Sequence, residues 1–257
     1  MLGRIAAHIS GEDADYLWYV RGITSALGVV PDFLYLEEEG VFSLMGPSEE
    51  GQRAIRKYIK DFFEEFNFYS LFGKDDGTLE NLQESYDLLF VKYKRKLFGR
   101  SVPEWILSGT DGLRLWVYKE GGKVDIKRVC LPVDFSERSV GQVEFTEYLR
   151  GFFKFDYDLV YAMNMSRFIN KLSSKDYTKS LSDKKEEIMQ MYTDIFGGKE
   201  LNLVILEGDP YREMVKYINS SNYDLVVIGR RGKGMRERIG SVSLHMVRSL
   251  KCPVVVL

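Results

Sequence analysis

One strand-like sequence occurs twice in this chain, and the repeat constrains the fold more than any other feature. Tyr86–Val91 reads YDLLFV and Tyr223–Ile228 reads YDLVVI, each an acidic start followed by apolar residues. One further apolar run lies near the start of each half, at Arg4–Ser10 and at Arg128–Asp134, and polar, turn-forming residues end both runs. Because internal similarity of this kind indicates a duplicated structural unit, the sequence predicts two related domains.

Helical patterns alternate with further strand-like runs in both halves. Strands that are apolar on both faces and separated by helices belong in a parallel sheet covered on both sides and reached by right-handed crossovers. We therefore predict two tandem α/β domains, residues 1–123 and 124–257, joined near Lys119–Lys123, where glycine and charge replace the periodic pattern. The residues that carry the first helical pattern of each half are Tyr16, Val20, Ile23 and Leu27, and Phe145, Tyr148, Leu149 and Phe152.

Composition and charge exclude several classes of protein. A hydrophobic fraction of 45% beside 29% charged residues is typical of globular domains, and 36 basic against 38 acidic residues leave no net field that recruits nucleic acid. No apolar run reaches the roughly 18 residues of a membrane helix, so we expect a cytoplasmic protein with neither a nucleic-acid nor a membrane partner. Two cysteines, Cys130 and Cys252, and two histidines are too few and too scattered for a disulfide framework or a structural zinc site.

A glycine-rich segment follows the second copy of the repeated strand. Gly229–Ser243 reads GRRGKGMRERIGSVS. Glycines at a strand's carboxyl end let the backbone approach a ligand closely, and the N–H groups of such a loop and of a following helix can hold a phosphate. Arg230, Arg231 and Lys233 add positive charge. A tight strand-to-helix turn with solvated basic residues is the alternative interpretation of the same segment.

Residues 127–257 resemble a universal stress protein domain in five segments that occur in the family's order. The resemblance implies an open, five-stranded parallel sheet with strand order 3-2-1-4-5 and helices on both faces, the adenine nucleotide alpha-hydrolase-like fold, in each half of the chain. The five segments are Arg128–Ser136 with its V-D-x-S type ending, Glu207–Pro210, Asp224–Gly229, Gly240–Val242 and Cys252–Val256.

The resemblance also implies a binding site where strands one and four diverge, since ligands of open α/β sheets bind at the carboxyl ends of strands where the winding reverses. In nucleotide-binding members of the family, the acidic residue after strand one and backbone after strand two hold adenosine, and the glycine loop holds the phosphates. Asp134 has an alternative role as the cap of the helix that follows it, and Ser241 has one as a residue of a helix's first turn. The residues carried over by position are Pro132, Val133, Asp134, Ser136, Met163, Ile228, Gly229, Gly232, Lys233, Gly240, Ser241 and Val242.

The spacing of the glycines departs from the family's nucleotide-binding pattern, which is G-2x-G-9x-G-(S/T). Only seven residues separate Gly232 from Gly240. Two hypotheses stay open: a stress-response protein that binds ATP or AMP, with Mg²⁺ if the ligand is ATP, and a nucleotide-free interaction or dimerisation module. Asp134 and Asp209 can recruit Mg²⁺ only alongside phosphates, and without a general base or metal cluster we expect at most slow ATP hydrolysis.

The first half resembles a diverged copy of the same domain. Lys92 and Arg95 stand where the second half has Gly229 and Gly232, and Ser10 replaces Asp134. Side chains at these positions would crowd a phosphate, so we expect a structural domain without a nucleotide of its own.

The end of the chain predicts how the halves associate. Pro253–Leu257 is an apolar edge strand, and such an edge invites pairing. Leu113–Tyr118 holds the corresponding position in the first half, so we expect the two strands to pair within one chain and imitate a dimer of the family. If each strand instead completes only its own sheet, a homodimer through helical faces is the alternative.

Overall fold

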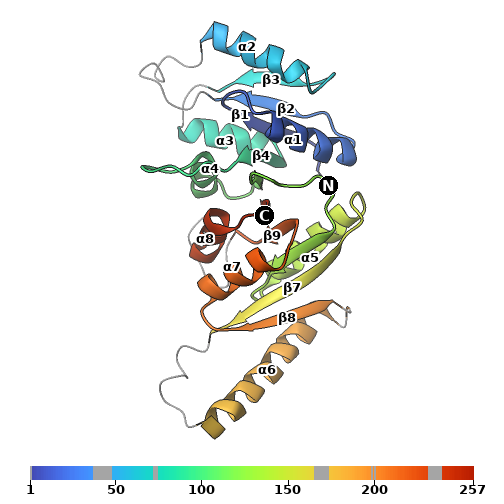
Figure 1. Ribbon diagram of the computed structural model, residues 1–257, viewed down its shortest axis with the longest axis vertical. Coiled ribbons are helices and arrows are strands. Elements are labelled where there is room, and N and C mark those ends of the chain that lie inside the picture. Colours follow the sequence, from blue (N-terminus) through green and yellow to red (C-terminus); the bar gives the residue numbers. More distant parts are fainter. Residues whose placement is uncertain are drawn as a thin grey trace. The chain divides into compact units, whose positions relative to one another are not determined.

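The computed structural model describes residues 2–36, 48–71, 75–164, 174–197, 199, 201–230 and 239–257, and strands alternate with helices throughout these ranges (Figure 1). The chain divides into two compact units, Met1–Ile126 together with Lys251–Leu257, and Lys127–Leu250. The last seven residues, which the sequence assigns to the second domain, therefore lie in the first unit.

The first unit contains five parallel strands in the order β3-β2-β1-β4-β5. This is the predicted order 3-2-1-4-5. The strands can pair in parallel because a helix follows each of the first four and forms the crossover to the next strand. Its elements are β1 (Ile5–Ile9), α1 (Ala14–Leu27), β2 (Asp32–Tyr35), α2 (Glu49–Lys60), β3 (Asn67–Ser70), α3 (Asp76–Ser85), β4 (Leu88–Lys92), α4 (Val102–Gly109) and β5 (Arg114–Tyr118).

A sixth strand, β10 (Val254–Val256), pairs antiparallel with β5. Val255 lies opposite Trp116, and both side chains are fully buried. The predicted pairing of the chain's last strand with Leu113–Tyr118 is confirmed. Through this pairing β10 lies with the first unit, which thus holds six of the described strands.

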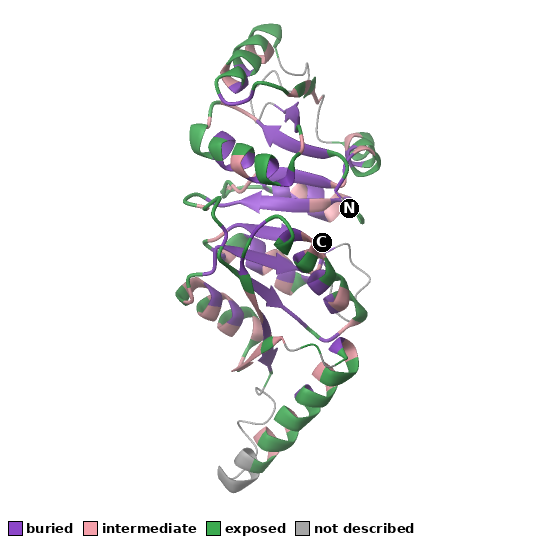
Figure 2. Ribbon diagram, turned by 90° about the vertical axis from the view of Figure 1, so that its right-hand side faces the viewer, coloured by how far each residue is buried: buried purple, intermediate pink, exposed green. Residues whose placement is uncertain are grey.

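The second unit repeats the order of the first for four parallel strands, β8-β7-β6-β9. In both units the central strands are buried, while the helices carry much of the exposed surface (Figure 2). The fold is thus α/β, with mostly parallel strands flanked by helices. The elements are β6 (Arg128–Pro132), α5 (Glu137–Arg150), β7 (Asp156–Met163), α6 (Ser174–Phe196), β8 (Asn202–Glu207), α7 (Pro210–Ser220), β9 (Leu225–Ile228) and α8 (Ser241–Ser249).

A cluster of four polar side chains, which we call the polar clasp, ties together the strands of the first unit. The carboxylate of Asp32 on β2 accepts hydrogen bonds from Arg4 Nη2 at 3.1 Å, Asn67 Nδ2 at 2.8 Å and the Tyr86 hydroxyl at 3.0 Å. The guanidinium of Arg4 also lies over the Tyr86 ring, 4.9 Å from its centroid. These contacts pin the segments before β1 and β4 to β2 and β3.

The second unit contains the same clasp in the same register. Asp158 accepts hydrogen bonds from Arg128 Nη2 at 3.2 Å, from the Tyr223 hydroxyl at 2.6 Å and from Asn202 Nδ2, and Arg128 lies 4.8 Å over the Tyr223 ring. Burial alone would raise the pKa of Asp158, but the hydrogen bonds from these three partners outweigh it and hold the pKa below its usual value. The duplication seen in the sequence therefore extends to individual side-chain contacts.

Candidate functional site

A cavity of about 350 Å³ lies in the second unit at the carboxyl ends of β6 and β9. Its volume falls within the range of about 300–1,000 Å³ that is typical of small-molecule sites. Apolar side chains make up most of the lining, with a few polar groups among them. The predicted site residues that line it are Pro132, Val133, Asp134, Ile228, Gly229, Gly240 and Val242.

Three other predicted site residues that the structure describes, Ser136, Met163 and Ser241, do not line this cavity. Ser136 and Ser241 each hydrogen-bond a neighbour, Asp134 and Tyr211 respectively. The side chain of Met163 is buried within its sheet, while its carbonyl accepts a hydrogen bond from Gly208 N at 3.0 Å. Gly232 and Lys233 lie outside the described residues.

The carboxylate of Asp134 is held at the rim of the cavity by the residues that follow it. Its Oδ1 accepts hydrogen bonds from Ser136 N at 3.1 Å, Ser136 Oγ at 2.6 Å and Ser139 Oγ at 3.1 Å. Ser136, rather than Asp134, is the N-cap residue of α5, so the alternative role of Asp134 as that cap is wrong. The three bonds fix the orientation of an exposed carboxylate beside the cavity.

Phe135 forms the turn that directs Asp134 outward. Its φ of 53° lies in the left-handed region, which is costly for a residue with a bulky side chain. The buried ring packs against Tyr161, with centroids 5.0 Å apart, and against Phe196 at 6.2 Å. This packing maintains the unusual backbone conformation, and Tyr161 itself lines the cavity.

Gln142 on α5 is the cavity-lining residue that could least be predicted from the sequence. Its buried Nε2 donates to the carbonyl of Pro132 at 3.0 Å and to that of Val227 at 3.2 Å, so one amide joins the ends of β6 and β9. A polar residue next to the apolar Val143 on the buried face of a helix was the available signal. The lining residues that the sequence did not predict are Gln142, Tyr161, Ala162, Asn164, Pro210, Met214, Ser243 and Met246.

The beginning of α8 forms another wall of the cavity. Gly240 is its N-cap residue, and Gly240, Val242 and Ser243 all line the cavity. Gly240 N donates to the Arg230 carbonyl at 2.7 Å, and Ser243 Oγ donates to the Gly229 carbonyl at 2.7 Å. Because the first N–H groups of a helix have no partner within the helix, this end of the cavity suits an anionic group.

The described residues provide little for a metal ion. Among them, no group of three or more His, Cys, Asp or Glu side chains could hold one. Asp209, the second predicted carboxylate, is the N-cap of α7 and accepts a hydrogen bond from Arg212 N at 3.1 Å. We therefore assign no protein-only metal centre to this part of the chain.

The equivalent position in the first unit is filled by an ion pair. Lys92, the last residue of β4, binds Asp13, the N-cap residue of α1, and about one fifth of each side chain is exposed. A lysine side chain thus stands where the second unit has Gly229 beside its cavity.

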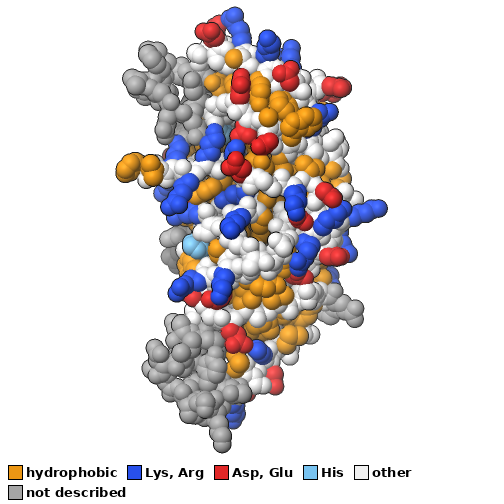
Figure 3. All heavy atoms as spheres, viewed as in Figure 1, with side chains coloured by type: hydrophobic (Ala, Val, Ile, Leu, Met, Phe, Trp, Pro, Cys, Tyr) orange, Lys and Arg blue, Asp and Glu red, His pale blue; other side chains and the backbone are white. Residues whose placement is uncertain are grey.

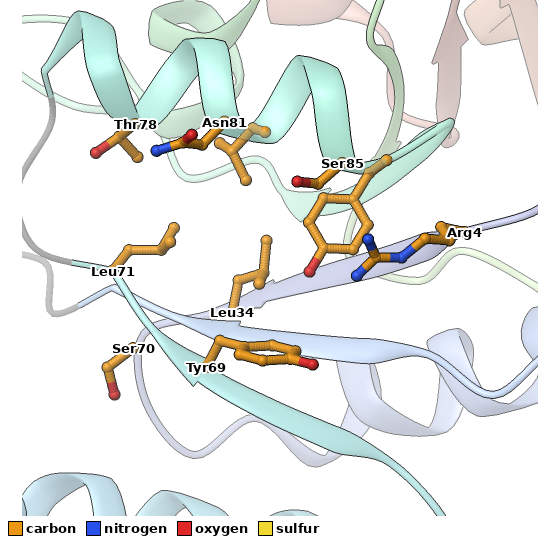
Figure 4. Close-up of a pocket in the computed structure, with 10 residues that line it drawn as sticks. Arg4, Leu34, Tyr69, Ser70, Leu71, Thr78, Asn81 and Ser85 are labelled. Atoms are coloured by element: carbon orange, nitrogen blue, oxygen red, sulfur yellow. The ribbon is translucent and has the colours of Figure 1, made fainter.

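The first unit has a cavity of its own in a different place. It measures about 450 Å³ and lies between α3 and the strands β2 and β3 (Figure 4). Thr78, Asn81 and Ser85 line it from the helix, and Arg4 and Tyr86 of the polar clasp border one end. None of the predicted site residues contributes to it.

Comparisons with known proteins agree with the described fold. The universal stress protein family model matches residues 125–257. A universal stress protein of Methanocaldococcus jannaschii is 25% identical over 137 residues, which cover 51% of this chain and 81% of that protein.

Two solved structures resemble the whole chain. One, from Pseudomonas aeruginosa UCBPP-PA14, has a TM-score of 0.69 at 13% identity and covers 100% of this chain and 93% of its own. The other, a universal stress protein from Archaeoglobus fulgidus DSM 4304, has a TM-score of 0.62 at 14% identity, covering 98% and 95%. At such low identity these likenesses show the fold.

Proposed function

Because the chain belongs to the universal stress protein family, we propose that its second unit binds an adenine nucleotide, ATP or AMP, in the cavity at the ends of β6 and β9. The observation that carries the proposal is the convergence of seven predicted site residues on one cavity. They come from segments that are far apart in the sequence, the ends of β6 and β9 and the start of α8.

The apolar part of the cavity suits the adenosine portion of such a ligand. Val133, Met214 and Ile228 offer apolar surface to a planar base. Asp134 presents a carboxylate at the rim, and a carboxylate that already accepts hydrogen bonds from serines is oriented to accept further ones from ribose hydroxyls. These features support adenosine binding without requiring a metal.

The wall formed by Gly229, Gly240 and the start of α8 is the place for the phosphates. The helix dipole and the first N–H groups favour negative charge there. Mg²⁺, if the ligand is ATP, would supply charge neutralisation on the phosphates themselves. Since the described lining contains Asp134 as its one ionisable carboxylate and no histidine, the proposed role is binding in a cytoplasmic stress response rather than catalysis.

Ligand-dependent stabilisation tests the proposal. A nucleotide at 100 times its dissociation constant stabilises the folded state by about 2.7 kcal/mol, which raises the melting temperature of a domain of this size by roughly 5–10 °C. We expect Val242→Trp, which fills the cavity, to abolish the shift, and Asp134→Asn to reduce it. Glu137→Gln is the matched control, because it removes an exposed carboxylate in the first turn of α5 that does not line the cavity.

The nucleotide-free interaction or dimerisation module is the second candidate function. The observation in its favour is that no lysine or arginine lines the described part of the cavity. Mass spectrometry of the denatured, freshly purified protein separates the two candidates. Released adenine nucleotide supports the binding function, whereas no released nucleotide and no thermal shift at millimolar ATP would leave the interaction module as the function.

A further inference from the structure

The segment between β4 and α4 exposes two adjacent large hydrophobic side chains almost completely. Leu97 is 93% exposed and Phe98 is 91% exposed, whereas the next most exposed large hydrophobic residue among the described ones, Trp18, is 55% exposed. Isolated surface hydrophobics are ordinary, but two neighbouring ones at this exposure leave a contiguous apolar projection in water. We call residues 94–100 the basic tip.

The basic tip is anchored at both ends. Before it, Tyr93 N donates to the Tyr118 carbonyl at 3.0 Å, which extends the edge of the sheet by one bond. After it, Ser101 is buried and donates through its N–H to Glu104 Oε2 at 2.9 Å, at the start of α4. Gly99, with a φ of 77°, supplies the turn. A short segment fixed at both ends holds Leu97 and Phe98 away from the body of the unit.

Positive charge surrounds the apolar pair on both sides. Lys94, Arg95 and Lys96 precede it, Arg100 follows it, and residues 93–100 contain no acidic residue. Lys94, Arg95 and Arg100 are exposed. Figure 3 shows hydrophobic side chains projecting at the place where Figure 1 has the segment after β4, with Lys and Arg side chains beside them.

We propose that the basic tip docks this protein on an anionic lipid surface. Leu97 and Phe98 would enter the boundary between head groups and acyl chains, and the flanking cations would contact the anionic head groups. Apolar side chains that protrude from a surface are buried only by a partner that can rearrange to surround them. The lipids of a fluid bilayer can do so. A phosphate backbone would satisfy the cations but would leave Leu97 in water.

Docking of this kind is peripheral. None of the described helices has both the length and the apolar character to cross a bilayer. The sequence prediction of no membrane partner rested on the lack of a spanning apolar run, and the basic run that contains Lys94, Arg95, Lys96 and Arg100 was interpreted as a solvated loop. The inference does not depend on the proposed nucleotide function.

The expected strength follows from charge and salt. A lysine or arginine close to an anionic membrane increases binding about fivefold, so four of them increase it several hundredfold. The attraction extends over a Debye length of about 10 Å at 0.1 M salt and about 3 Å at 1 M. Binding should therefore require anionic lipid and should decline steeply as salt is added.

Co-sedimentation of the full chain with vesicles tests the proposal. One set of vesicles contains phosphatidylcholine alone, and the other contains phosphatidylserine as about one third of its lipid. We expect binding to the anionic vesicles at low salt. Two variants should each weaken it at least tenfold: Leu97→Ser with Phe98→Ser, and Lys94→Gln with Arg95→Gln and Arg100→Gln. The matched control, Arg56→Gln with Lys57→Gln and Lys60→Gln, removes three exposed cations from α2 and should bind as the wild type does.

Several results would overturn the proposal. Equal binding of the wild type and both tip variants would show that the tip is not the contact, as would loss of binding in the α2 control. No binding to anionic vesicles at low salt would refute lipid docking outright. If the wild type instead self-associates, or binds duplex DNA more tightly than vesicles, and the tip variants lose that property, the tip belongs to a protein or nucleic-acid interface.

Discussion

Replacing Tyr223 with phenylalanine tests whether the polar clasp stabilises the second unit. The substitution keeps the ring over which Arg128 lies but removes the hydroxyl that donates to Asp158 Oδ2 at 2.6 Å. The Asp158 side chain is only 16% exposed, so water replaces the lost donor poorly. A hydrogen bond to a charged group contributes about 1.5–3 kcal/mol, and we expect Tyr223→Phe to lower the free energy of unfolding by that amount at pH 7.

The effect should depend on pH with a defined sign. Since the clasp holds the pKa of Asp158 below its usual value in the folded protein, the stability that it contributes is complete above the unfolded pKa of about 3.9. That contribution is lost as the pH falls through the lower, folded pKa. The difference between wild type and Tyr223→Phe should therefore shrink below about pH 4.

Urea unfolding followed by circular dichroism measures both quantities. Tyr217→Phe is the matched control, because the Tyr217 hydroxyl lies 3.4 Å from that of Tyr223 and makes no described bond to Asp158. Tyr217→Phe should lower the free energy of unfolding clearly less than Tyr223→Phe does. Tyr86→Phe, the equivalent change in the first unit, should resemble Tyr223→Phe because Tyr86 donates to Asp32 at 3.0 Å. The reasoning would be refuted if Tyr223→Phe lowered the free energy of unfolding by less than about 0.5 kcal/mol at pH 7, or by the same amount at pH 3 as at pH 7.

Two further predictions concern the first unit. Val255→Pro removes a backbone N–H from the middle of β10, the strand that pairs with β5, so we expect a loss of about 1–3 kcal/mol of stability, measured by urea unfolding; an unchanged midpoint would contradict the pairing. Burial lowers the pKa of Lys119 to about 8 from 10.5, so its neutral form favours the folded state. Relative to Lys119→Met, the free energy of unfolding should rise as the pH rises from about 8 to 10.5 and stay level below pH 7; a constant difference over this range would argue against the buried amine.

The cavity-lining residues that could be predicted most directly from the sequence are those at the carboxyl ends of strands. Pro132, Val133 and Asp134 end one apolar run, and Ile228 and Gly229 end another, so the order of the strands is enough to bring them together. Ser241, for which the sequence left open a phosphate-binding role and a place in a helix's first turn, is the first residue of α8 and hydrogen-bonds Tyr211 on the neighbouring helix α7. Nothing in a linear pattern specifies that contact.

The cavity-lining residues on helices could not be predicted either, because their positions depend on how each helix packs against the sheet. Gln142 reaches two strands only because α5 packs on β6 and β9 with one particular rotation. Met214 and Met246 line the cavity from α7 and α8, where a stripe of apolar residues predicts burial in general rather than a position beside a ligand. Only part of the polar clasp could be predicted from the sequence. Tyr86 and Tyr223 belong to the repeated strand sequence, whereas Asn67 and Asn202 belong to no repeated pattern.

The pairing of β10 with β5 has a consequence for how the protein is made. Residues 1–126 leave the ribosome first, but the strand that covers the β5 edge lies within the last seven residues of the chain. Until β10 has been synthesised, the backbone of β5 presents an apolar edge with Trp116 and Val117 beside it, which is a template for pairing with other chains. A ribosome that stalls anywhere before β10 therefore releases a product with that edge uncovered.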